Sequence, residues 1–116
     1  MGITSSQALI KSALNGIDLI EIDQAELSES GVFILYDGGI RTAMGIVDRE
    51  FAIFCAGFSI SGESGLKQVV EDIEHSLYEI SRIRTDIEHT QTLPIAVADN
   101  GLLIYRINVK IIDMES

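Results

Sequence analysis

Residues 64–84 read SGLKQVVEDIEHSLYEISRIR. Apolar residues recur there every three or four positions, which is the spacing of a single stripe along an α-helix. Ser64 is a favoured N-cap residue, and Arg82 and Arg84 fall in the last turns, where cations suit the helix dipole. The pattern predicts an amphipathic helix about 30 Å long, enough to cross a whole sheet. Its apolar stripe comprises Leu66, Val69, Val70, Ile73, Leu77 and Ile80.

Strands are predicted on both sides of this helix. Residues 32–36 form a continuous apolar run, which favours a strand covered on both faces, and the Asp37-Gly38-Gly39 sequence that follows has turn chemistry. Residues 50–61 form a second strand, with Ala52, Phe54, Ala56, Phe58 and Ile60 on one face. After the helix, Asn100-Gly101 predicts the turn of a hairpin between residues 94–98 and 102–112.

The remaining segments are shorter or less regular. Thr4 and Gln7 fit a capping box that opens a short helix, which Asn15-Gly16 ends. Residues 17–23 are predicted as an edge strand or an extended segment, and residues 24–30 as one polar helical turn or a loop. Residues 40–48 are predicted as a loop or a weak strand, and residues 89–93 as a loop. The chain is therefore predicted to be one α+β domain, residues 1–116, in which both helices pack on one face of an antiparallel or mixed sheet.

Composition narrows the classes of function. Hydrophobic residues make up 47% of the 116 residues, enough to bury one core. No stretch resembles a signal peptide or a membrane span, so a cytoplasmic location is expected. Eighteen acidic residues outnumber eight basic ones, for a net charge of -10. Because nucleic-acid and anionic-lipid binding rely on clustered Lys and Arg, both are disfavoured.

Motifs that carry chemistry are weak in this sequence. Cys55 lies in an apolar run and is interpreted as a buried thiol. The two histidines, His75 and His89, lack the converging partners of a zinc site. Ser64 and Lys67 match the S-x-x-K pattern without its companion motifs, and residues 62–65 fit no phosphate-binding fingerprint. We therefore predict no catalytic, cofactor or metal site.

The order of elements resembles a family of small proteins of Mu-like phages and prophages, related to tail terminators. The likeness covers residues 32–113: the apolar strand at 32–38, the strand at 50–61, the glycine-containing start of the long helix, the segment 93–95, and the closing hairpin sequence NGLLIYRINV at 100–109. This resemblance implies a non-enzymatic structural protein of the host cytoplasm and the virion tail. Such proteins form a ring, commonly a hexamer, that contacts other tail or head-completion proteins, and DNA passes through it.

A ring requires contacts between subunits, and two features fit that need. Open sheet edges can pair with a neighbouring copy. In addition, residues 38–49 combine apolar and basic side chains and are predicted to form an arm that docks on a neighbour. The predicted interface residues are Ile40, Arg41, Met44, Ile46, Val47 and Arg49.

Two other functions stay open at this point. The first is an acidic binding module, of a bacterial regulatory or immunity type, that docks a basic partner. The second is a small enzyme, which would require a cleft with perturbed titratable groups. The size of the particle in solution separates a ring from a monomeric docking module.

Overall fold

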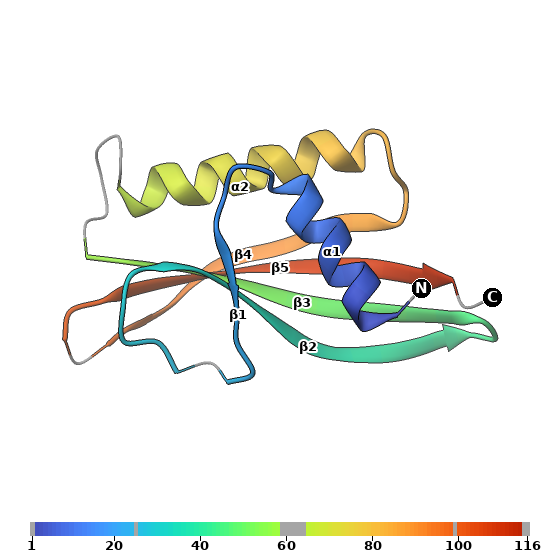
Figure 1. Cartoon of the computed structure of the whole chain (residues 1–116), viewed down its shortest axis with the longest axis horizontal. Coiled ribbons are helices and arrows are strands. Elements are labelled where there is room, and N and C mark those ends of the chain that lie inside the picture. Colours follow the sequence, from blue (N-terminus) through green and yellow to red (C-terminus); the bar gives the residue numbers. More distant parts are fainter. Residues whose placement is uncertain (1, 25, 59–64, 99, 115–116) are drawn as a thin grey trace.

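The structure is a computed structural model, and it describes residues 2–24, 26–58, 65–98 and 100–114. These residues form two helices and a five-stranded sheet (Figure 1). In chain order the elements are α1 (Ile3–Ala13), β1 (Leu19–Glu21), β2 (Gly31–Ala43), β3 (Ile46–Gly57), α2 (Leu66–Ser81), β4 (Ile87–Val97) and β5 (Leu103–Met114).

The sheet has the strand order β1-β2-β3-β5-β4. Strands β2 and β3 form one long hairpin and β4 and β5 another, and β3 pairs with β5 between them. The short β1 runs parallel to β2, with Leu19 opposite Val32, so the sheet is mixed. The α+β class, the edge strand near residue 20 and the C-terminal hairpin are confirmed.

The long helix lies where its apolar stripe predicts, although its bounds are narrower. Four stripe residues are buried: Leu66, Val70, Ile73 and Leu77. Gly65 is the N-cap, and the predicted cap Ser64 lies outside the described residues. The helix ends at Ser81, and the chain then turns toward the sheet. Arg84 lies in this connection and forms an ion pair with Asp86 at 2.8 Å.

The N-terminal helix corrects one prediction. It begins at Ile3 with Gly2 as its N-cap and no capping side chain, so the capping box at Thr4 is wrong. The backbone N–H of Ser6 already donates to the Gly2 carbonyl at 2.9 Å, which places Thr4 inside the first turn. The predicted stop is confirmed, because the helix ends at Ala13 and Gly16 takes a φ of +94°.

Two strands are longer than predicted, and both differences involve bulges. Residues 37–39 are not a turn, because β2 passes through them with a shift in register after Tyr36 and a φ of +119° at Gly38. For residues 40–48 the strand alternative is confirmed, because they form the end of the β2–β3 hairpin. Residues 89–93 are part of β4, which shifts register between His89 and Gln91. In each case polar or glycine residues mark a β-bulge within a continuing strand.

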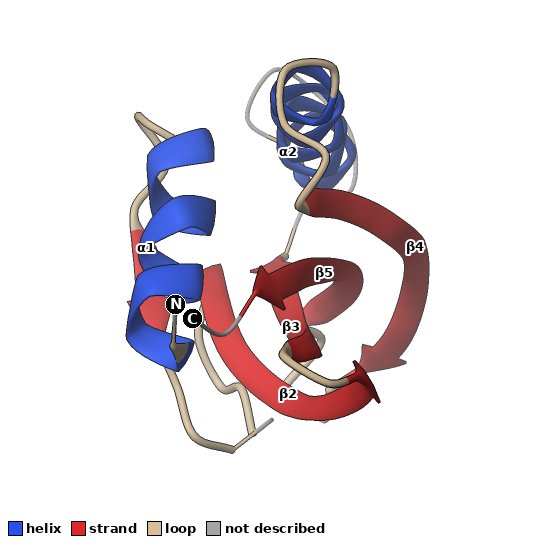
Figure 2. Cartoon of the chain, turned by 90° about the vertical axis from the view of Figure 1, so that its right-hand side faces the viewer, coloured by secondary structure: helices blue, strands red, loops and turns tan. Residues whose placement is uncertain are grey.

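Both faces of the sheet bury apolar side chains. The helices share one face (Figure 2), where α1 and α2 pack on residues of β2, β3 and β5. On the opposite face, Ile22 and Leu27 from the segment after β1 pack on a smaller cluster. This cluster consists of Phe33, Ala52, Phe54, Ala56, Leu102 and Ile104. The predicted cover on both faces of residues 32–36 is thus confirmed, with Phe33 and Ile34 buried on opposite sides.

Candidate interaction surfaces

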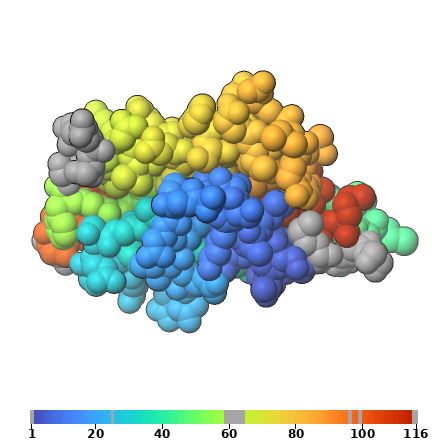
Figure 3. Space-filling model, turned by 45° about the horizontal axis from the view of Figure 1, so that its top comes forward, coloured from blue at the N-terminus to red at the C-terminus, as the bar shows by residue number. Residues whose placement is uncertain are grey.

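The most exposed apolar side chain of the described residues lies at the end of the β2–β3 hairpin. We call residues 40–46 the hairpin tip. Pairing persists up to Ala43 and Ile46, so Met44 and Gly45 alone form the turn. Met44 is 99% exposed and Ile40 is 62% exposed. The tip projects from one end of the molecule beside the end of β5 (Figure 3).

The structure divides the six predicted interface residues into two groups. Ile40, Arg41 and Met44 are exposed on the hairpin tip, and Ile46 is half-buried. Val47 and Arg49 point inward instead, because Val47 is in the core and the Arg49 guanidinium binds within the chain. These two side chains offer little surface to a neighbour, and the exposed part of the predicted surface is the hairpin tip, residues 40–46.

Arg49 anchors a polar cluster at the base of the hairpin tip. Its Nε donates to Asp113 Oδ2 at 2.6 Å and its Nη1 to Tyr36 Oη at 3.0 Å. Asp113 is fully buried. Burial by itself would raise the pKa of the Asp113 carboxyl, but the pKa is lowered because hydrogen bonding and positive charge, including that of Arg49, outweigh burial. Gly39 leaves space for this cluster, since a Cβ there would lie 2.8 Å from Tyr36 Oη.

A second group of exposed apolar side chains lies at the opposite end of the sheet, which we call the far end. Phe58 is 59% exposed at the end of β3, and Val97 is 68% exposed at the end of β4. Val97 pairs with Leu103, which pairs with Gly57, whereas Ile46 of the hairpin tip lies eleven positions from Gly57 along β3. The two groups are therefore separated along the 45 Å axis of the molecule.

The long edge strand β4 carries features that oppose pairing with another strand. Within the described residues, nothing pairs with its outer edge. Its backbone shifts register twice, between His89 and Gln91 and between Pro94 and Ala96, and Pro94 has no N–H to donate. Bulges and prolines are devices that protect sheet edges. A lateral strand-to-strand contact at β4 is therefore disfavoured relative to contacts at the two ends.

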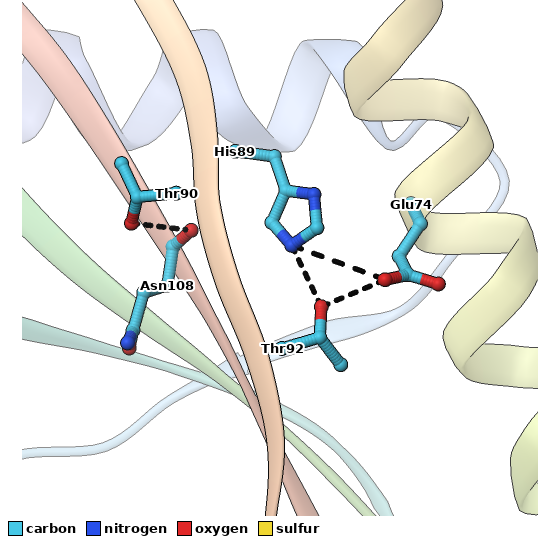
Figure 4. Close-up of polar contacts among 5 residues, drawn as sticks. All are labelled: Glu74, His89, Thr90, Thr92 and Asn108. Carbon is cyan, nitrogen blue, oxygen red and sulfur yellow. Dashed lines mark hydrogen bonds and ion pairs between the residues drawn. The ribbon is translucent and has the colours of Figure 1, made fainter.

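One polar network joins helix α2 to β4. The Thr92 hydroxyl lies 2.8 Å from Glu74 Oε2 and 2.6 Å from His89 Nε2 (Figure 4). Because the hydroxyl has a single proton, donation to Glu74 requires that it accept from a protonated His89 Nε2. The Thr92 hydroxyl thus joins a helix residue to a strand residue, and we interpret the network as a tie between helix and sheet.

Neither the thiol nor the carboxylates form a recognisable reactive centre in the described residues. Cys55 is fully buried, and burial, with a smaller contribution from Glu74, raises its pKa to about 12. No group of three or more His, Cys, Asp or Glu side chains in this part of the chain could hold a metal. Residues 62–64, with the serine of the S-x-x-K pattern, lie outside the described residues.

The sheet face away from the helices carries charged pairs along β5. Lys110 binds Glu88 at 3.2 Å, and this hydrogen bond is the largest cause of the raised pKa of Lys110. Arg106 binds Asp37 and lies over the buried Phe54 ring, with 5.6 Å from Cζ to the ring centroid. This cation–π contact covers the edge of the smaller apolar cluster. Charged side chains thus flank and partly cover the smaller apolar cluster on this face.

No protein-family model matches the sequence, and no curated protein shows significant similarity to it. Neither α1 nor α2, nor any other helix of the described ranges, combines the length and apolar character needed to cross a bilayer.

Proposed function

We propose that the protein is a non-enzymatic structural subunit that assembles with copies of itself into a closed ring, as the resemblance to tail-terminator-like phage proteins implies. In this role it contacts other tail or head-completion proteins, and the ring is commonly hexameric in that family. Its contacts are head to tail: the hairpin tip of one copy meets the far end of the next.

One observation carries the proposal. The exposed apolar groups at the two ends of the molecule are different, with Met44 and Ile40 at one end and Phe58 and Val97 at the other. Contiguous exposed apolar surface on a folded domain is typical of a site for protein association. Contacts between two unlike surfaces are heterologous, and they close into a ring when the rotation per subunit allows.

The direct test compares a substitution on the hairpin tip with one outside it. Met44→Asp would place a charge where an apolar contact forms, and burial of an unpaired charge is costly. We expect it to weaken self-association at least tenfold, measured by light scattering and sedimentation over a concentration series. Gln91→Glu is the control, because Gln91 is exposed on β4, outside the proposed contact, and the substitution also adds one negative charge.

The outcomes separate clearly. Both variants should fold as the wild type does, since surface substitutions usually change stability by about 0.5 kcal/mol or less. Loss of association in Met44→Asp but not in Gln91→Glu supports the proposal. Equal association in all three proteins argues against a contact at the hairpin tip, and a wild type that stays monomeric at every concentration argues against the ring.

A second function has its own supporting observation. The segment between β1 and β2 exposes three carboxylates, Asp23, Glu26 and Glu29, without a lysine or arginine among them, next to Glu21, which forms an ion pair with Lys11 at 3.0 Å. This acidic surface fits the alternative of a module that docks a basic partner. A monomeric wild type that binds a basic protein with strong salt dependence would favour it over the ring.

A further inference from the structure

The far end contains a pocket that the proposed ring leaves unexplained. It has a volume of about 350 Å³ and opens between the start of β2, the end of β3 and the first turn of α2. Its lining is mainly apolar and includes Val32, Ala56, Phe58, Leu66 and Val69, with Ser30 among the residues that line it. Gly57 also lines the pocket, and its position lies next to Leu66.

The hairpin tip carries an exposed apolar side chain of a kind that fills apolar pockets. Met44 stands almost fully exposed on a two-residue turn, held out by paired strands on both sides. Methionine is unbranched and flexible, so it fills irregular apolar gaps well. The pocket is larger than one methionine side chain, which leaves space for part of the flanking turn.

The positions of the two features exclude an intramolecular contact. The pocket includes Gly31 and Gly57, and the paired strands β2 and β3 run from there to the turn at Met44. Since a strand rises about 3.3 Å per residue, the twelve residues of β3 place the two features on the order of 35 Å apart. Met44 can therefore enter this pocket only on another copy of the chain.

We infer that the pocket between β2, β3 and α2 is the receptor for Met44 of a second copy of this chain. This inference rests on the proposed function and adds the identity of the two contacting sites. A side chain on one surface that enters a pocket elsewhere on the next molecule gives a repeating, one-directional contact. Because every subunit carries both parts, the contact continues around the ring until it closes.

Cross-linking of two separate variants tests the inference. Met44→Cys is mixed with Ser30→Cys at a concentration where light scattering detects the assembly, and a short bis-maleimide is added. Both positions are exposed, so the folds should persist. The native Cys55 is buried and should stay unreactive. Thr85→Cys replaces Ser30→Cys in the control, because Thr85 is exposed but follows the other end of α2.

We expect the Met44→Cys and Ser30→Cys pair to give at least ten times more covalent heterodimer than the control pair. A chain with both substitutions should give a ladder of products that ends at one closed species. Dominant Met44→Cys homodimers, or equal yields with the control, would overturn the inference. If the variants assemble without the expected cross-link, the pocket assignment fails and the ring stands. If the wild-type chain does not assemble, both fail.

Discussion

Asp113 and Arg49 form the buried ion pair beneath the hairpin tip. Removal of one partner of such a pair leaves a charge in a poorly solvated site and commonly costs 3–5 kcal/mol. We expect Asp113→Ala to lower the free energy of unfolding by about 3 kcal/mol at pH 7, measured by urea denaturation. The control is Glu88→Ala, which removes the carboxylate of an exposed pair with Lys110 and should cost about 1 kcal/mol or less. Equal losses would contradict this account of the Arg49 cluster.

The pH dependence of the same pair has a definite sign. Because the pKa of Asp113 is lower in the folded chain than its ordinary value of about 3.9, the unfolded chain binds this proton more readily. The stabilisation is therefore complete above roughly pH 5 and is lost as the pH falls through the folded pKa. The stability difference between the wild type and Asp113→Ala should shrink in acid. A difference that grows between pH 5 and pH 3 would show the opposite shift.

Helix α2 provides the test at the scale of an element. Ile73 is fully buried against the sheet, and His75 is exposed on the other side of the same helix. We expect Ile73→Ala to cost about 2–5 kcal/mol of unfolding free energy, from lost burial and the cavity left behind. His75→Ala should change it by about 0.5 kcal/mol or less. A large effect of His75→Ala in urea denaturation would indicate a role for that face that the fold does not explain.

The elements also show how far the sequence predicts this fold. Periodicity located α2, the alternation of β3 and the hairpin at Asn100-Gly101, because each depends on local spacing. It failed at Gly38 and at residues 89–93, where turn-like or polar residues form bulges that only the neighbouring strand defines. The Glu74–Thr92–His89 network joins residues up to 18 positions apart, so no local spacing in the sequence could predict it.

At the scale of the molecule, the exposed hairpin tip was predicted from its composition, but its counterpart was not. Ile40 and Met44 stood out as apolar residues between turn residues. The pocket draws Ser30, Val69 and Phe58 from three separate segments, and their proximity arises only when β2, β3 and α2 converge. The inward orientation of Val47 and Arg49 likewise depends on the packing of distant segments, so the sequence could not show it.

The central claim is that copies of this chain join end to end into a closed ring. The most direct measurement is the mass of the wild-type particle, by sedimentation velocity and native mass spectrometry over a wide range of concentrations. We predict one discrete species whose mass is a fixed multiple of the 12.7 kDa chain and does not grow further as concentration rises. A monomer at every concentration, or a symmetric dimer that goes no further, would contradict the claim.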